Sequence, residues 1–336
     1  MNEDSRHRKA VPYTPASRAL GVIVGFDGSD QGSRALHYAA VEAHRRDLQL
    51  TVISAFTVPR AVAGYVDSAA EITGDSLARR GAEEVLDEAR DQLHGYPGHV
   101  EYRVEHGDAA GVMIARSENA THAVVGGRGR GGFVGRLLGS VSSALPAHAH
   151  CPTTVVNRRY DPDLVGGDTR FTARRDARPV IVGVDGSAHG RVAALHAAEA
   201  AGLRGTSLQL LLALPTIDSS LLWYAGRTAK ESGITELEMQ GLQERLDGDV
   251  RWLTGHFPDL SIEGIIEQGS PTQVMAHATE RAQLTVLGTR GRGSITSALL
   301  GSVSRSVLME AHGPVEIVPL LTDRRLNDHG EHEPVL

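Results

Sequence analysis

Two glycine-rich segments of the chain share the spacing G-x2-G-x9-G-S, and these residue types suit anion binding. The pattern residues are Gly126, Gly129, Gly139 and Ser140 in the first segment and Gly288, Gly291, Gly301 and Ser302 in the second. Glycine at the first two positions lets the backbone turn sharply and come close to an anion. A Gly-Ser pair that opens a helix presents free N–H groups and the positive end of the helix dipole, which favour a phosphate. A flexible loop followed by an ordinary helix cap is the alternative interpretation, and the repeated spacing favours the phosphate site.

Arginine is the cation that accompanies both segments. The flanking arginines are Arg128, Arg130, Arg290 and Arg292. Lysine occurs only at Lys9 and Lys230, so neither segment is the loop G-x-x-x-x-G-K-[ST], in which a lysine reaches the phosphates. The dinucleotide pattern G-x-G-x-x-G is also absent after the first predicted strand, where the turns read D-G-S-D-Q-G and D-G-S-A-H-G. Dehydrogenase chemistry is therefore disfavoured.

The two segments belong to an internal duplication. GVIVGFDGSDQGSRALHYAA from residue 21 matches PVIVGVDGSAHGRVAALHAA from residue 179, and AVVGGRGRGGFVGRLLGSVSSAL from residue 123 matches TVLGTRGRGSITSALLGSVSRSV from residue 285. The 336 residues thus hold two copies of one domain. We place the copies at 19–157 and 179–320, joined by an exposed linker over 158–178, and expect disordered polar ends over 1–18 and 321–336.

Within each copy, short β-branched runs alternate with longer helical patterns. The predicted strands are Leu20–Phe26, Gln49–Phe56, Val100–Glu105, Ala123–Gly126 and Thr153–Asn157 in the first copy and Val180–Val184, Leu208–Leu214, Ser261–Glu267, Leu284–Leu287 and Val315–Pro319 in the second. The predicted helices of the first copy are Asp30–Arg46, Asp75–His94, Ala109–Asn119 and Ser140–His148. This alternation predicts an α/β fold with two tandem, doubly wound parallel sheets of five strands each.

A carboxylate follows the first predicted strand of each copy. These carboxylates are Asp27 and Asp185, while Gly126 and Gly288 follow the fourth strands. In a doubly wound sheet, ligands bind beyond the carboxyl ends of the strands where the strand order reverses. If the first and fourth strands are neighbours, the carboxylate and the glycine-rich loop share one crevice. A plain helix cap or turn former is the alternative role for each aspartate.

These motifs together resemble the tandem form of the universal stress protein family. The resemblance rests on the doubled F/V-D-G-S turn, the G-x2-G-x9-G-S loop and the closing A-H-C-P or A-H-G-P before the last strand, and it covers nearly all of Leu20 to Leu320. It implies an adenine nucleotide alpha hydrolase-like fold with strand order 3-2-1-4-5, which puts the first and fourth strands side by side. It also implies that each copy binds ATP, with or without Mg²⁺.

The resemblance carries roles over to residues at matching motif positions. Asp27 and Asp185 would hold the ribose or adenosine end of ATP, and Ala55 and Ala213 would lie against adenine. The implied phosphate-binding residues are Gly126, Arg128, Gly129, Gly139, Ser140 and Val141 in the first copy and Gly288, Arg290, Gly291, Gly301, Ser302 and Val303 in the second.

The copies differ at two points near these loops. Gly127 stands where the family usually has Ser or Thr, whereas Thr289 keeps a hydroxyl in the second copy. Pro146 falls within the helix that Ser140 begins, so we expect that helix to be kinked or shortened. We therefore expect the two sites to differ in affinity.

Composition excludes several other classes of function. The chain has 34 Lys and Arg against 41 Asp and Glu, so its formal charge of −7 points to no nucleic-acid or anionic-membrane partner. The only cysteine, Cys151, fits a reducing compartment, and no run of about 18 apolar residues suggests a membrane span. His148, His150 and Cys151 form a tempting cluster, but a closed zinc site needs about four ligands. We expect a cytoplasmic protein without a bound metal.

The leading hypothesis is an ATP-binding stress-response regulator or adaptor that is not an enzyme. No nucleophile, base and orienting group recur together in the two copies. The alternatives are a slow ATPase or nucleotide-processing enzyme, and a structural dimerisation module without turnover. Single-domain members of the family dimerise through the last strand, so the resemblance implies that the two copies pair through their last strands within one chain. A further homodimer of chains and an unidentified regulatory protein partner complete the expectation.

Overall fold

The computed structural model describes residues 10–57, 68–129, 138–162, 170–172, 176–215, 236–291 and 300–328, with the backbone alone described over 68–74. The first copy contains β1 (Val22–Gly25), α1 (Asp30–Arg45), β2 (Leu50–Phe56), α3 (Ser68–Gln92), β3 (Val100–His106), α4 (Ala109–Ser117), β4 (His122–Gly126), α5 (Ser140–His148) and β5 (Thr153–Val156). The second contains β6 (Val180–Gly183), α7 (Ala188–Arg204), β7 (Leu208–Leu214), α9 (Glu236–His256), β8 (Ile262–Gln268), α10 (Pro271–Arg281), β9 (Leu284–Gly288), α11 (Ser302–Glu310) and β10 (Val315–Val318).

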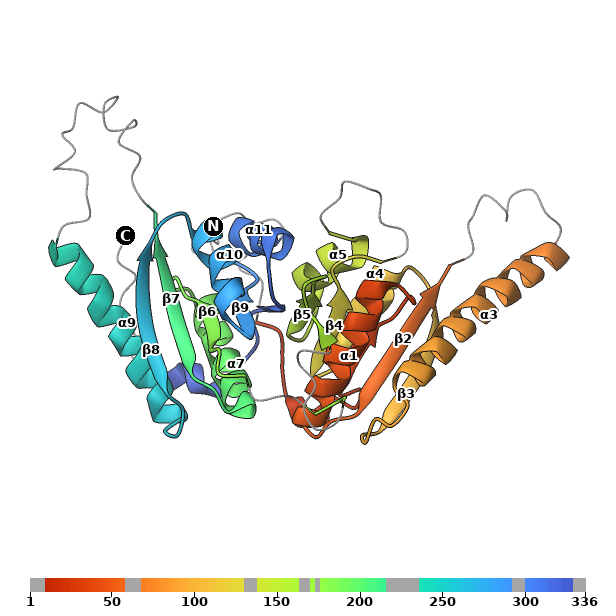
Figure 1. Cartoon of the computed structure of the whole chain (residues 1–336). Coiled ribbons are helices and arrows are strands. Elements are labelled where there is room, and N and C mark those ends of the chain that lie inside the picture. Colours follow the sequence, from red (N-terminus) through yellow and green to blue (C-terminus); the bar gives the residue numbers. More distant parts are fainter. Residues whose placement is uncertain are drawn as a thin grey trace, which may run out of the picture.

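The strands of the described segments join one ten-stranded sheet in the order β3-β2-β1-β4-β5-β10-β9-β6-β7-β8. Each half is parallel and has the predicted order 3-2-1-4-5, because β1 pairs with both β2 and β4, and β6 pairs with both β7 and β9. The halves meet where β5 and β10 pair antiparallel. The two domains are therefore joined by backbone hydrogen bonds through their last strands. Figure 1 shows the two halves side by side.

Apolar residues on both sides of the strands place helices on both faces of the sheet. Helices α1 and α3 cover one face of the first half, and α7 and α9 cover the same face of the second, each pair over its own core. On the opposite face, the core under α4, α5, α10 and α11 is continuous across the two copies. Met113 of α4 and Met275 of α10 both belong to it. This shared core adds apolar burial to the strand pairing that joins the halves.

We call the antiparallel pairing of β5 and β10 the seam. A cluster of buried charged side chains joins α1 and α7 near it. The Glu42 carboxylate, 1% exposed, accepts hydrogen bonds from Arg45 (2.7 Å) and Arg46 (2.6 Å) of its own helix and from Arg204 (2.8 Å) of the second copy. Arg204 also donates to the Tyr38 hydroxyl (3.1 Å). Burial alone would raise the pKa of Glu42, but the guanidinium groups of Arg204, Arg46 and Arg45 hold that pKa well below its usual range. One carboxylate thus links α1 to α7 across the domain boundary.

The seam itself carries polar side chains. Thr154 of β5 lies opposite Glu316 of β10, and both side chains are buried. His122 of β4 lies 2.8 Å from the Thr154 hydroxyl through Nε2, and the same nitrogen is 3.9 Å from Oε2 of Glu316. Burial lowers the pKa of His122 to about 3 and raises the pKa of Glu316 to about 7. Both groups are therefore biased toward their neutral forms.

Parts of the chain ends, which we expected to be disordered, are ordered over residues 10–18 and 321–328. Val11 pairs in parallel with Leu321, its N–H donating to the Leu320 carbonyl at 2.7 Å. Leu321 is buried, and Arg18 donates to the carbonyls of Ser117 (2.7 Å) and Ala120 (2.9 Å). The difference arises because these polar segments contain a few apolar side chains that reach the core of the second copy.

The segment predicted as an exposed linker also packs in part against the first copy. Tyr160 and Phe171 are buried in the core beside α1. His37 of α1 lies 2.9 Å from the Tyr160 hydroxyl and 2.7 Å from the Arg170 carbonyl. Pro146 does not shorten α5, because α5 and its counterpart α11 both have nine residues. Within the described segments, no helix combines the length and the apolar character that a bilayer span requires.

Candidate functional site

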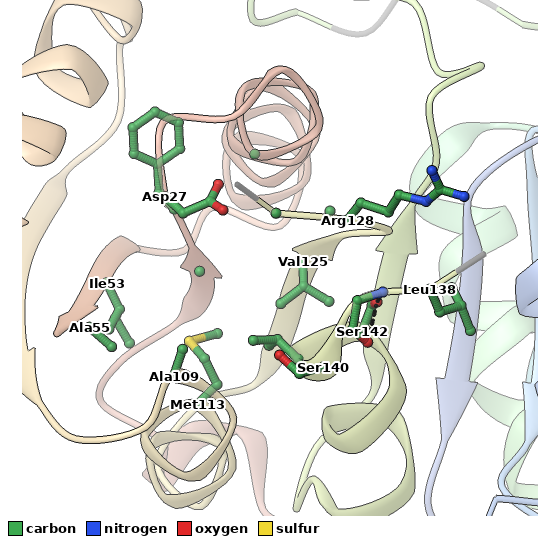
Figure 2. Close-up of a pocket in the computed structure, with 17 residues that line it drawn as sticks. Asp27, Ile53, Ala55, Ala109, Met113, Val125, Arg128, Leu138, Ser140 and Ser142 are labelled. Carbon is green, nitrogen blue, oxygen red and sulfur yellow. Dashed lines mark hydrogen bonds between the residues drawn. The ribbon is translucent and has the colours of Figure 1, made fainter. Parts of the chain in front are cut away.

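The carboxyl ends of β1, β2 and β4 and the start of α5 enclose a cavity of about 330 Å³ (Figure 2). All the predicted site residues of the first copy line it: Asp27, Ala55, Gly126, Arg128, Gly129, Gly139, Ser140 and Val141. An equivalent cavity of about 710 Å³ lies in the second copy. Its lining includes Asp185, Ala213, Gly288, Arg290, Gly291, Gly301, Ser302 and Val303. The structure therefore brings each predicted set together, while Arg130 and Arg292 lie outside the described residues.

The D-G-S turn positions the aspartate of each copy. In the first, Oδ1 of Asp27 accepts hydrogen bonds from the Ser29 N–H (3.1 Å) and the Ser29 hydroxyl (2.6 Å). The Ser29 hydroxyl in turn accepts from the Gly32 N–H (3.1 Å) and caps α1. Gly28, between Asp27 and Ser29, has φ of 72°, a left-handed conformation that glycine adopts without strain. The turn therefore fixes one carboxylate oxygen and directs the other toward the loop after β4.

The loop glycines are required by close packing against the first strand-helix turn. A Cβ atom on Gly129 would lie 2.3 Å from Oδ2 of Asp27, and one on Gly291 would lie 2.5 Å from Oδ2 of Asp185. A Cβ atom on Gly126 would lie 2.7 Å from the Gln31 carbonyl oxygen. At Gly126 the contact would be with backbone, and at Gly129 and Gly291 the aspartate side chain would have to shift. The spacing G-x2-G therefore lets the loop backbone pass directly over an unmoved aspartate.

The first turn of α5 closes the other side of the cavity. The Gly139 N–H donates to the Gly127 carbonyl (2.9 Å), and the Ser142 hydroxyl donates to the same oxygen (2.7 Å). In the second copy, the Gly301 N–H donates to the Thr289 carbonyl (2.8 Å). These bonds hold the helix start against the loop, and the first-turn N–H groups without intrahelical partners remain available to an anion.

The remaining wall of the first cavity is apolar, a property that our sequence reasoning missed. Ile53, Met113 and Val125 line it beside Ala55 (Figure 2). Leu211, Met275 and Leu287 are the equivalents in the second copy. These residues occupy matching positions of the two repeats, so aligning the copies for shared apolar residues could have found them. Each cavity thus combines an apolar wall, one carboxylate and a helix N-terminus.

The two cavities differ in their charged surroundings. Figure 2 shows the Arg128 side chain extending away from Asp27 and Ser140, so only the base of this residue faces the predicted phosphate end. In the second copy, His189 packs against Gly288. Burial and then the Arg290 cation lower the pKa of His189, while Asp185 acts in the opposite direction. The larger second cavity also has Arg305 in its lining.

The cluster around Cys151 has an ordinary structural explanation. His150 pairs with Glu118 at 3.5 Å, and Cys151 is fully buried in the shared core. Burial raises the pKa of the Cys151 thiol to about 12, so the thiolate form that reacts or binds metals is disfavoured. Over the described ranges, no three His, Cys, Asp or Glu side chains come together in a way that could hold a metal ion.

Comparison with known proteins agrees with this geometry. The sequence pattern of the universal stress protein family matches residues 21–157 and 177–319. The chain belongs to the universal stress protein family. It is 31% identical over 312 residues to a universal stress protein of Mycobacterium tuberculosis strain H37Rv, covering 88% of this chain and 95% of that protein. It is 33% identical over 303 residues to one from Mycolicibacterium smegmatis, covering 89% and 96%.

Two solved structures share the fold of nearly the whole chain. A universal stress protein from Archaeoglobus fulgidus superposes with a TM-score of 0.62 at 20% identity, covering 91% of this chain and 98% of that one. A structure from Pseudomonas aeruginosa PAO1, described as functionally unknown, gives a TM-score of 0.56 at 16% identity, covering 91% and 95%. At these identities the likeness concerns the fold alone.

Proposed function

We propose that each copy of this universal stress protein binds an adenine nucleotide, and that ATP occupancy regulates its action as a stress-response regulator or adaptor. The observation that carries the proposal is the set of surfaces that each cavity brings together. An apolar wall, a fixed carboxylate and the N-terminus of a helix all line it. These surfaces suit adenine, ribose hydroxyls and phosphates respectively.

Each part of the nucleotide has a partner of matching chemistry in the first copy. Adenine packs on Ile53, Ala55 and Met113, and the Asp27 carboxylate accepts hydrogen bonds from the ribose. The phosphates lie against the first-turn N–H groups of α5. Asp27 is the only acid in the described lining, so the nucleotide phosphates and water would supply most ligands of any Mg²⁺ that accompanies ATP.

We propose that the nucleotide is held rather than turned over. The described lining of the first cavity contains the hydroxyls of Ser140 and Ser142 but no histidine, cysteine or lysine that could act as a base beside them. The Ser142 hydroxyl is already bonded to the Gly127 carbonyl. Slow hydrolysis by water remains the alternative, and phosphate release at useful rates that is lost on Asp27→Ala with Asp185→Ala would favour it.

The joined sheet disfavours a purely structural role for the last strands. In a single-domain member those strands are free to pair with another molecule, whereas here β5 and β10 are already paired with each other. We propose that the protein works in the cytoplasm, consistent with its single, buried cysteine. A homodimer of whole chains would have to use another surface, and light scattering would detect it.

Equilibrium dialysis with ATP tests the nucleotide proposal. The variant Gly129→Ala with Gly291→Ala places a methyl group against each aspartate, so we expect affinity to fall by about tenfold or more at both sites. Gly81→Ala with Gly241→Ala is the matched control, because a Cβ atom at either position meets nothing within 4 Å. Equal and negligible binding by the wild type and both variants would refute the proposal.

A further inference from the structure

We infer that a third cavity, lying between the two domains, binds an oligophosphate anion. Its volume is about 280 Å³, and residues of both copies line it. Gln31, Arg128, Asn157, Arg158 and Arg159 come from the first copy. The end of α11, including Met309 and Glu310, and Val315 of β10 come from the second.

Charge is the first argument for an anion. Three arginines, Arg128, Arg158 and Arg159, are among the lining residues, against a single acid, Glu310. The direction of Arg128 agrees with this assignment, since Figure 2 shows its guanidinium group pointing away from the nucleotide cavity. Guanidinium groups bind phosphate oxygens through directed, charge-assisted hydrogen bonds. We call this third cavity the anion cavity. Its lining has more arginines than acids, and arginine is the cation best suited to phosphate.

Contacts across the domain boundary hold the backbone at Asn157 in place, beside the two arginines of the anion cavity. The Asn157 amide group donates to the carbonyls of Ala311 (2.9 Å) and Gly313 (2.8 Å) in the second copy. Its side-chain oxygen accepts from the Arg159 N–H (2.9 Å). Asn157 thus fixes the point where Arg158 and Arg159 leave β5, and it does so only when the two domains are joined.

The second copy has no arginines at the positions equivalent to Arg158 and Arg159. Val318 of β10 pairs with Gly288 of β9 in the same way as Val156 of β5 pairs with Gly126 of β4. The residues that follow Val156 are therefore equivalent to those that follow Val318. Asn157, Arg158 and Arg159 thereby correspond to Pro319, Leu320 and Leu321. Of these, Leu321 is buried in the core of the second copy, where it pairs with Val11. Fold geometry alone does not require arginines here.

The position of the anion cavity connects it to both nucleotide cavities. Arg128 and Leu138 line the first nucleotide cavity as well, and Met309 lines the second. The oligophosphate could therefore be a free anion or the distal phosphates of a nucleotide seated in the first copy. Only the latter source rests on the function proposed above, so the two are tested separately.

Calorimetric titration of the whole chain with tripolyphosphate at low salt, in the presence of excess adenosine, tests the free anion. We expect Arg158→Gln with Arg159→Gln to weaken binding about tenfold, and Glu310→Gln to strengthen it about threefold, because the latter removes a like charge. Arg79→Gln with Arg80→Gln is the charge-matched control, an exposed adjacent pair on α3. It should leave the affinity unchanged.

Titration with ATP and with AMP tests the distal phosphates. If the Arg158→Gln, Arg159→Gln variant binds ATP about tenfold more weakly but AMP as well as the wild type does, nucleotide phosphates fill the anion cavity. If that variant binds tripolyphosphate, ATP and AMP with wild-type affinities, the inference is wrong. Failure of AMP and ATP to bind at all, with tripolyphosphate still sensitive to the variant, would refute the nucleotide proposal and leave the anion cavity standing.

Discussion

Replacing Glu316 with glutamine should make the protein more stable at pH 8 and change little near pH 4.5. The carboxyl lies in the seam with 2% of its side chain exposed, opposite Thr154 and 3.9 Å from Nε2 of His122. Burial raises its pKa from 4.5 to about 7; the Arg46 and Arg204 cations oppose this, and the Glu42 and Glu199 carboxylates add to it. Glutamine keeps the shape of the neutral acid without its titration.

The magnitude follows from the two pKa values of Glu316. Between 4.5 and about 7 the folded protein holds a proton that the unfolded chain has released, so stability falls as the pH rises. The contribution of this group is complete below about pH 4.5 and is lost through about pH 7. A shift of this size corresponds to about 3 kcal/mol. Glutamine does not ionise, so the Glu316→Gln variant does not lose this stability as the pH rises.

Urea unfolding of the wild type and of Glu316→Gln at pH 5, 6, 7 and 8 measures the effect. His122 titrates in both proteins, so its own pH dependence largely cancels in the difference between them. Glu84→Gln on the exposed surface of α3 is the control, with no expected pH-dependent difference. An equal stability difference at pH 5 and pH 8 would refute the reasoning, because it would mean that Arg46 and Arg204 keep Glu316 ionised in the folded state.

Two further predictions concern buried groups near the same interface. Glu42→Ala removes the carboxylate that Arg45, Arg46 and Arg204 share, and we expect the free energy of unfolding to fall by about 3 to 5 kcal/mol in urea titrations; a loss below about 1 kcal/mol would show that the arginines find other partners. Cys151 is buried with its pKa raised to about 12, so a thiol reagent should label it only after unfolding, and rapid labelling of the native protein at pH 8 would contradict the buried position.

The parts of this structure that were predictable are those with local sequence signals. The Asp27 turn and the loop at Gly129 are short patterns that occur twice, so the sequence predicted that the aspartate and the loop of each copy share one crevice. The Arg128 side chain extends away from the first nucleotide cavity, and Arg128 also lines a cavity shared by both domains; no short pattern encodes this arrangement. Arg204 likewise looks like a solvated residue at a helix end, yet the tertiary fold buries it.

The ordered chain ends were missed for a related reason. Val11 and Leu321 pair only with each other, at opposite ends of the sequence, and each stands within a polar segment. A single apolar residue in such a segment carries no periodicity. Tyr160 and Phe171 were missed in the same way, because only the surface of α1 shows where the two rings pack.

The seam between β5 and β10 also bears on the evolutionary history of the chain. Thr154 and Glu316 are equivalent residues of the two repeats and face each other directly, so the pseudo-two-fold axis passes between them. In a symmetric dimer of identical subunits, a residue on that axis faces its own copy, and a glutamate there would oppose a second buried glutamate. Fusing the two copies into one chain removes this restriction of symmetry. The two halves can then differ at the axis, and Glu316 of the second half faces Thr154 of the first instead of a second buried glutamate.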